Sequence, residues 1–383
     1  MSQTPSVFPF FRLTGSHRQI GRQFGEAAAP LIRHHLDEAL ARLGSGNRLS
    51  RADALAAAMH YRPFVQAHAP FLDEEILGVA EGAGLALDEA YLLQLRAEAA
   101  TPTSAGPAPL LAGPHDGPDE CTTVAALGAL TADGTTIIGH NADLPALYRE
   151  VGVMVEIVPD DAPSMLMLTP AGQVSYIGMN DRGLTVTANY LTCDGWREGY
   201  PRYLLSRIAL LHETVDAAIA AIRAIPRASS RNMMFTDAHG SAADLEMTTT
   251  RDARITPTDG VLAHSNHYTA AALASEERAG AEYVANSTAR INRIRELALE
   301  GRGHLDVPSM QALLRDRVCF PDTLCRMPGD WDGRDVLTFA SLVAVPARRE
   351  LWVAVGPPNE HEYQQHTFSS PVGGSLVGSG RAG

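Results

Sequence analysis

Apolar residues recur at a spacing of three or four through the first hundred residues of the chain. The stripes at 20–32 and 76–83 both follow this helical period, and a further apolar stretch covers 87–99. The pattern predicts that the chain opens as a series of helices. The composition then changes, because 101–120 holds five prolines and three glycines. Such a segment sustains neither a helix nor a central strand, so it predicts an exposed loop.

From residue 121 onward the period switches to two, which is typical of strands. Strands are predicted over 121–130, 135–139, 151–158, 164–168, 174–177, 184–188, 232–236, 243–248, 260–265, 337–345 and 350–355. Helices are predicted over 203–225, 270–299 and 308–314. Runs of strands that alternate with helices in this way favour an α+β layered domain over a doubly wound one. The Gly- and Ser-rich tail at 369–383 is predicted to be disordered.

Charge and hydrophobicity narrow the class of protein. The chain has 31 Lys and Arg against 44 Asp and Glu, a formal charge of −13, which argues against nucleic acid as a partner. No window approaches the about 18 apolar residues of a membrane-spanning helix. The first residues also lack the basic start of a signal peptide. We therefore expect a cytoplasmic protein without a membrane partner, and its 45% hydrophobic residues allow a large core.

The four cysteines, which are too few for a disulfide framework, are expected to be reduced thiols. Cys121 differs from the others because it begins the first predicted strand, directly after the Pro/Gly loop. Cleavage of the Glu120–Cys121 bond would give it a free α-amine with a pKa of about 7.7–8.0, suited to a general base. One residue would then be both nucleophile and base. The alternative from these features alone is a strand cysteine that faces the core.

Other chemical motifs carry little weight. His264 and His267 are spaced like metal ligands, but no third ligand follows at a recognisable spacing, so structural or solvated histidines are predicted. The glycines at 378–383 imitate a dinucleotide motif without a helix to receive a pyrophosphate. The sequence also lacks a P-loop and a Gly-x-Ser-x-Gly elbow. No metal and no cofactor-binding residues are predicted.

The segment Asp119-Glu-Cys-Thr-Thr123 resembles the processing site of the autoproteolytic cysteine acyltransferases of the isopenicillin N acyltransferase family. The family type has Gly before the nucleophile, whereas this chain has Glu120. Further matches to the family follow in the same order from about residue 11 to residue 368. They lie at 15–21, 74–83, 95–98, 139–143, 177–183, 189–190, 200–201, 207–210, 264–267 and 324–326.

This resemblance implies the four-layer αββα fold of the N-terminal nucleophile hydrolases, with a helical N-terminal pro-region. It also implies a precursor that cuts itself between Glu120 and Cys121. Residues 1–120 would form the pro-region and processing loop, and residues 121–368 the catalytic domain. In the precursor the Cys121 thiol would attack the Glu120 carbonyl carbon and give a thioester that water hydrolyses.

The resemblance also implies the roles of the site residues. Cys121 would attack the substrate acyl group, and Asp143 would orient its α-amine. Asn189 and Asn266 would donate hydrogen bonds to the oxyanion. Arg326 would favour the thiolate or hold a substrate carboxylate. For Asp143 and Arg326 a plain structural ion pair is the alternative.

The implied reaction is cleavage of a linear amide of a small N-acyl compound through a thioester acyl-enzyme. Hydrolysis comes first because water needs no dedicated site, and coenzyme A would at most be an acyl carrier in an N-acyltransferase. No tightly bound cofactor is implied. The partners are the small N-acyl substrate, or a coenzyme A thioester, and the two self-cleaved fragments with each other. The alternative of another class is an uncleaved member that only binds small ligands.

Overall fold

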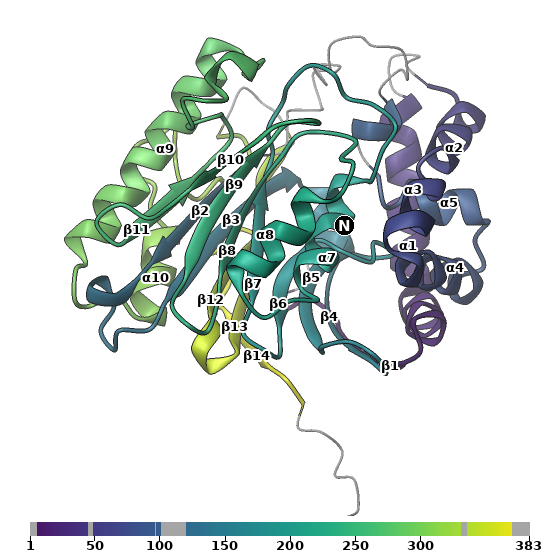
Figure 1. Cartoon of the computed structure of the whole chain (residues 1–383), viewed down its shortest axis with the longest axis horizontal. Coiled ribbons are helices and arrows are strands. Elements are labelled where there is room, and N and C mark those ends of the chain that lie inside the picture. Colours follow the sequence, from purple (N-terminus) through teal and green to yellow (C-terminus); the bar gives the residue numbers. More distant parts are fainter. Residues whose placement is uncertain (1–5, 45–48, 96, 101–119, 331–334, 370–383) are drawn as a thin grey trace, which may run out of the picture.

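The computed structural model describes residues 6–44, 49–95, 97–100, 120–330 and 335–369 (Figure 1). Of the Pro/Gly loop predicted at 101–120, residues 101–119 lie outside the described residues, and Glu120 begins a buried strand instead. Of the disordered tail predicted at 369–383, residues 370–383 lie outside the described residues, whereas Ser369 donates a hydrogen bond to Glu156.

Two sheets form the centre of the molecule. The eight-stranded sheet has the order β1 (Phe10–Gly15), β4 (Gly152–Pro159), β5 (Met165–Pro170), β6 (Ile177–Asn180), β7 (Thr185–Asn189), β8 (Arg231–Thr236), β9 (Ala242–Met247), β10 (Asp252–Ile255). The six-stranded sheet has the order β11 (Val261–His264), β2 (Glu120–Ala126), β3 (Ile137–Pro145), β12 (Val336–Val345), β13 (Glu350–Val355), β14 (Gln364–Thr367). Neighbouring strands are antiparallel, except that β1 runs parallel to β4.

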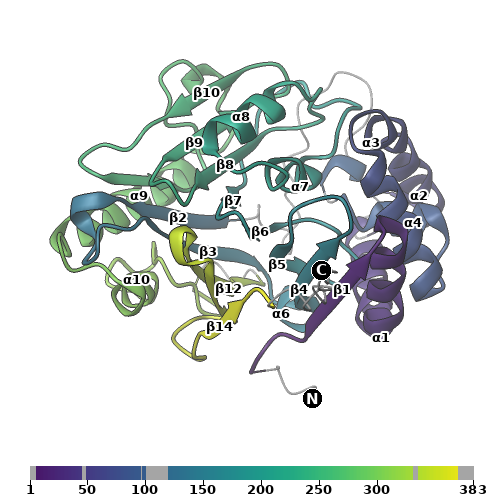
Figure 2. The same ribbon diagram turned by 60° about the horizontal axis from the view of Figure 1, so that its bottom comes forward.

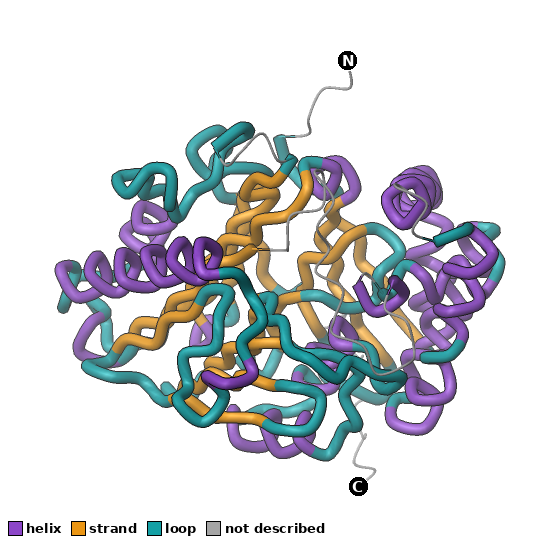
Figure 3. The backbone as a smooth tube through the Cα atoms, turned by 90° about the horizontal axis from the view of Figure 1, so that it is seen from above, coloured by secondary structure: helices purple, strands orange, loops and turns teal. Residues whose placement is uncertain are grey.

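The sheets contact each other through β2 with β7 and β11 with β9, and helices cover their outer faces. Helices α7 (Leu205–Ala209) and α8 (Val215–Arg223) pack on the eight-stranded sheet, and α9 (Ala281–Glu300) and α10 (Val307–Leu314) on the six-stranded one. Figure 3 shows the strands in the middle and helices outside. Strands β2, β3 and β12 are buried along their whole length, as expected for strands covered on both faces. The predicted four-layer αββα sandwich is confirmed.

The remaining helices are α1 (His17–Gly44), α2 (Arg51–Met59), α3 (Arg62–His68), α4 (Pro70–Ala83), α5 (Leu87–Leu92) and α6 (Leu147–Val151). All of them except the short α6 gather beside β1 and β4. Short 3₁₀ turns lie at Ala97–Ala100, Gly128–Leu130, Arg202–Leu204, Ala274–Glu276 and Pro346–Arg348. The prediction that the chain opens with helices is therefore confirmed. The prediction did not include β1, which lies along β4 (Figure 2). None of the helices in the described part of the chain is both long and apolar enough for a membrane crossing.

Helices α1 and α4 pack at backbone distance through glycines. A Cβ built on Gly21 would lie 1.9 Å from the Glu75 carbonyl oxygen, and one on Gly78 would lie 2.3 Å from that of Arg18. Real Cβ atoms cannot approach so closely, and a larger residue at either position would push the helices apart. Both glycines lie in segments that carry the family resemblance, and packing explains their presence.

The N-terminal helices share one core with the sheets. Buried residues of α1 and α4, such as Ile20 and Leu72, belong to the same apolar cluster as Leu168 of β5. A buried ion pair adds a polar link, because Arg207 of α7 donates to both oxygens of Glu75 at 2.7 and 2.9 Å. Residues before 120 are thus bound tightly to those after it. The division at residue 120 stays a prediction.

Two predicted helices are shorter than expected. The stretch 203–225 is broken before Thr214, whose hydroxyl accepts from the Ala217 amide and starts α8. The helix predicted from 270 begins only at 281, because the Glu277 carboxylate accepts from nearby backbone amides, among them Ala279 at 2.7 Å, and holds the chain in a loop. The edge strands β10 and β14 were missed, since both are partly exposed and β14 is wholly polar.

Candidate active site

Cys121 lies in β2, where successive side chains point to opposite faces of the six-stranded sheet. On the inner face, Thr123 donates to Asn189 Oδ1 of β7 at 2.9 Å. On the outer face, Arg290 of α9 donates to Thr122 Oγ1 at 2.9 Å. Cys121 therefore faces the space between the sheets, and Glu120 faces α9. By this alternation the Cys121 thiol and the Glu120 carboxyl lie on opposite sides of β2.

The backbone of Cys121 is held on both sides by side chains. Its N–H donates to Asn266 Oδ1 at 2.8 Å, and its carbonyl accepts from Ser265 Oγ at 2.8 Å and from Arg290 at 2.7 Å. Ser265 and Asn266 directly follow β11, which pairs with β2. Arg290 also donates to Asn266 Oδ1 at 3.0 Å, so two N–H donors determine which end of that amide is oxygen. The amide nitrogen of Asn266 then donates to the Tyr190 carbonyl at 3.2 Å.

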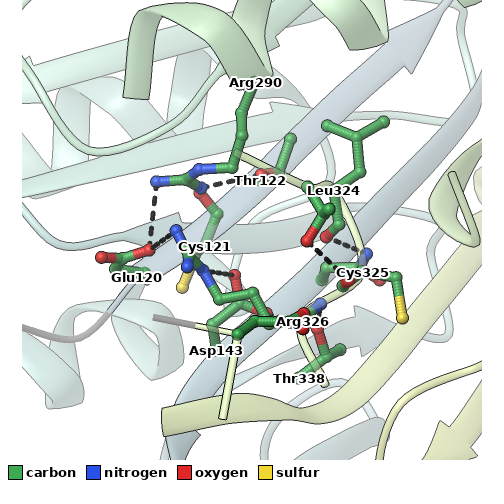
Figure 4. A network of polar contacts seen from close by, with 12 residues as sticks. Glu120, Cys121, Thr122, Asp143, Arg290, Leu324, Cys325, Arg326 and Thr338 are labelled. Carbon is green, nitrogen blue, oxygen red and sulfur yellow. Dashed lines mark hydrogen bonds and ion pairs between the residues drawn. The ribbon is translucent and has the colours of Figure 1, made fainter. Parts of the chain in front are cut away.

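Four charged residues form a buried cluster on the outer face, and each is at most 1% exposed. We name Glu120, Asp143, Arg290 and Arg326 the ion cluster (Figure 4). Glu120 pairs with Arg326 and, at 3.5 Å, with Arg290, while Arg326 Nε lies 3.7 Å from Asp143. Strand register explains the grouping, because Glu120 and Asp143 are opposite each other in β2 and β3. Two acids and two guanidinium groups compensate one another.

The protonation of Asp143 is finely balanced. Burial raises the pKa of its carboxyl to about 7, although Arg326 and Arg290 act in the opposite direction. Its remaining described contact is a hydrogen bond of 2.6 Å from the Thr338 hydroxyl. Near neutral pH this group can hold or release a proton, which suits the role predicted for it beside a new α-amine.

A pocket opens at Cys121 between the two sheets. Its lining residues are Cys121, Tyr176, Ala188, Asn189, Tyr190, Arg202, Tyr203 and Arg231. Asn189 Oδ1 accepts from Thr123 and, at 3.3 Å, from Asn232. Its buried Nδ2 has no hydrogen-bond partner among the described residues. The pocket wall beside the thiol therefore carries a spare N–H donor.

The predicted site residues thus fall into two groups. Cys121, Asn189 and Asn266 meet at the inner face and the strand end, while Asp143 and Arg326 lie with Glu120 in the ion cluster. Sequence reasoning missed Arg290, although its position carried a signal. It lies on the stripe of α9 that includes the buried Tyr283, Ser287 and Ile294. An arginine on the apolar face of a helix requires buried polar partners.

A second buried cluster lies behind the site. Asp244, Glu246 and His264 have ligand-type atoms within 4.8 Å of one another, so this donor set could hold a metal ion. The contacts instead fit a protonated His264 imidazole, because Nε2 lies 3.0 Å from Glu246 and Nδ1 donates to the Ser265 carbonyl at 2.8 Å. Burial alone would lower the pKa of His264, but Asp244 and Glu246 outweigh it and raise the pKa to about 9. His264 therefore anchors the segment that holds Cys121.

This cluster makes stability depend on pH. The raised pKa of His264 stabilises the fold fully below about 6.5, and this contribution is lost as the pH rises through about 9. We expect the parent to lose unfolding temperature between pH 6.5 and 9, and His264→Gln to lose less. His267→Gln is the control, because burial lowers the pKa of His267 to about 4, outside this range. Calorimetry showing one slope for all three proteins would contradict the assignment.

Two sheets with helices on their outer faces, and a cysteine strand beside the pocket between them, form the layered sandwich that the sequence predicted. A family profile described as acyl-coenzyme A:6-aminopenicillanic acid acyl-transferase matches residues 130–360. The match spans more than half of the chain, which therefore belongs to this family. The resemblance found in the sequence is confirmed.

The chain is also similar to individual proteins, at low sequence identity. The chain is 26% identical over 352 residues to a protein of Emericella nidulans named acyl-coenzyme A:6-aminopenicillanic-acid-acyltransferase 40 kDa form, with 90% of this chain and 92% of that one covered. Among solved structures, a mutant conjugated bile acid hydrolase from Clostridium perfringens has 13% identity and a TM-score of 0.44, covering 65% of this chain and 97% of that one. Penicillin V acylase from Agrobacterium tumefaciens has 12% identity and a TM-score of 0.40, with 61% and 83% covered.

Proposed function

We propose that the chain cuts its own Glu120–Cys121 bond and then uses Cys121 as an N-terminal nucleophile on amides of small N-acyl compounds. The observation that carries this proposal is the hydrogen bond of 2.8 Å from the Cys121 N–H to Asn266 Oδ1, beside a pocket lined by Cys121. An acceptor already in place at this nitrogen would hold the α-amine that cleavage creates.

In the first reaction, Sγ of Cys121 attacks the carbonyl carbon of Glu120. The bond from that carbon to the Cys121 nitrogen breaks, the nitrogen takes a proton, and water hydrolyses the resulting thioester to a carboxylate and a thiol. Both sides of the bond are held for this step. Arg326 and Arg290 pair with the Glu120 side chain, while Asn266 and Ser265 hold the backbone of Cys121. Such positioning lowers the entropy cost of the attack.

In the second reaction, the freed thiol attacks a substrate amide and the α-amine carries the proton to the leaving amine. Asn189 Nδ2, which is unpaired among the described residues, supports a role as oxyanion donor. The side-chain amide of Asn266 has both an acceptor and a donor, so its oxygen can hold the amine while its nitrogen serves as the second donor to the oxyanion. Asp143 and Arg326 would set the charge around the amine from the outer face.

Water is the acceptor that we propose for the thioester, so the reaction is amide hydrolysis. The name of the Emericella nidulans relative favours a second candidate, N-acyl transfer from an acyl-coenzyme A thioester. The two are distinguished by incubating the purified protein with a panel of N-acyl compounds, with and without coenzyme A, and measuring released amines and acyl products.

Self-cleavage is tested by intact mass and N-terminal sequencing of the purified protein. We expect two polypeptides, residues 1–120 and 121–383, that co-elute in size-exclusion chromatography. They should stay together because the N-terminal helices share the core of the sheets and the Glu75–Arg207 ion pair. An active enzyme whose sole N-terminus lies near Met1 would contradict the proposal.

A further inference from the structure

Arg231 is a buried charge in the wall of the pocket at Cys121. It begins β8, is 3% exposed, and lines the pocket together with Cys121 and Asn189. Its Nε and Nη2 atoms are buried without a hydrogen-bond partner, and it takes part in none of the ion pairs found among the described residues. A buried guanidinium whose Nε and Nη2 lack hydrogen bonds and which has no ion pair is costly, so its presence calls for an explanation.

Other buried arginines of this protein have hydrogen-bond or ion-pair partners that compensate their buried charge. Arg207 donates to both oxygens of Glu75, and Arg290 donates to Asn266 and Thr122. Arg202, beside Arg231 in the pocket, has its Nε 3.6 Å from Glu98. The residues that line the pocket thus include two guanidinium groups, of Arg202 and Arg231, and no carboxylate.

The surroundings of Arg231 are aromatic. Its guanidinium carbon lies 4.7 Å from the centre of the Tyr203 ring, and the Tyr203 and Tyr176 rings are 5.9 Å apart. Burial lowers the pKa of Arg231 to about 10, so it still carries its charge at neutral pH. The Nε and Nη2 edge of this guanidinium, which lies over the Tyr203 ring, matches the geometry of a carboxylate, because a carboxylate binds such a fork through two parallel hydrogen bonds.

We propose that Arg231 binds a carboxylate of the substrate, so that the preferred substrates are N-acyl compounds with one carboxylate and an apolar or aromatic body. This inference rests on the proposed function of Cys121. It also assigns carboxylate binding to Arg231 instead of Arg326, because Arg326 already pairs with Glu120 and donates to Asn286 at 2.9 Å. Arg231 is a specificity residue, and the chemistry stays with Cys121.

Binding can be measured without turnover, in the uncleaved Cys121→Ala chain. The probes are 3-phenylpropanoate and 3-phenylpropanamide, which differ in charge and hardly in shape, and the measurement is titration calorimetry. We expect the carboxylate to bind at least about tenfold tighter, and Arg231→Met in the same background to abolish the preference. Equal binding of both probes, or a preference that survives Arg231→Met, would overturn the inference even if the enzyme proves active.

Activity then locates the carboxylate on the substrate. Hexanoylglycine and hexanoylglycinamide test the amine side, and glutaryl and pentanoyl p-nitroanilide test the acyl side. Arg231→Met should lower kcat/KM by about 10²-fold for the charged member of the preferred pair and change that of its neutral counterpart by less than about threefold. Arg231→Lys should recover part of the loss. An equal loss on charged and neutral substrates would make Arg231 catalytic and overturn the specificity role.

Thermal unfolding separates binding from structure. Arg231 has no ion pair, and no hydrogen bond at Nε or Nη2, among the described residues, and a methionine can replace its contact with the Tyr203 ring. Arg231→Met should therefore leave the unfolding temperature unchanged or raise it. Arg227→Met is the matched control, since Arg227 is also buried but donates to the Thr248 and Arg251 carbonyls at 2.9 and 3.2 Å. That variant should unfold at a lower temperature. A drop for Arg231→Met as large as that of the control would show a structural arginine. If the wild type is uncleaved and turns over nothing, the proposed function fails, while the binding experiment still decides on Arg231.

Discussion

Cys121→Ala should remain a single uncleaved chain of 383 residues and lose turnover by about 10⁴-fold or more. The substitution removes the sulfur that would attack both the Glu120 carbonyl and the substrate amide, and no other group at the pocket can replace it. Intact mass measures the cleavage, and release of amine measures the turnover. Cys121→Ser should still cleave slowly, because a hydroxyl can perform the same shift as a poorer nucleophile.

Cys193→Ala is the matched control for loss of a buried thiol. Burial raises the pKa of Cys193, as it raises that of Cys325 to about 12, so both thiols stay protonated and unreactive. The control should cleave normally and turn over within about threefold of the parent. A Cys193→Ala protein as inactive as Cys121→Ala, or a Cys121→Ala protein that still cleaves itself, would show that the nucleophile is misassigned.

The position of Cys121 could be predicted because its signal is local. A Pro/Gly-rich segment followed by a strand is readable from neighbouring residues, and the alternation of β2 then separates Glu120 from Cys121. Which face of β2 lines the pocket depends on its packing against β7, more than sixty residues away. No pattern among the residues near Cys121 predicts that packing. The packing of the sheets decides this point.

Arg231 and Arg290 show the limit of sequence reasoning more clearly. Arg231 directly precedes the strand predicted at 232–236. An arginine at the end of a strand is expected to be exposed to solvent. Its guanidinium is buried over the Tyr203 ring with no hydrogen bond at Nε or Nη2, and this arrangement depends on how Tyr203 and Arg202 pack on the eight-stranded sheet. Charges that look alike in sequence therefore differ in function according to the partners that folding supplies.

Asn266→Ala should lower kcat by roughly 10²–10³-fold with little change in KM, because an oxyanion donor acts chiefly in the transition state. The Asn266 side chain lies beside Cys121, as predicted, and its Oδ1 accepts from the Cys121 nitrogen. The substitution should also slow self-cleavage, whose intermediate carries the same oxyanion. Rates are therefore expressed per cleaved molecule, with the cleaved fraction measured by intact mass.

Asn266→Asp separates the two ends of this amide. It keeps an oxygen toward the Cys121 nitrogen and Arg290, but it has no N–H to donate to an oxyanion. If donation matters, Asn266→Asp should lose as much kcat as Asn266→Ala. Near-parental turnover of Asn266→Asp would refute the oxyanion role and leave Asn266 as the acceptor that holds the amine. A fall in unfolding temperature at parental turnover in both variants would instead mark Asn266 as a turn residue, since a structural role affects the folded state and not the transition state.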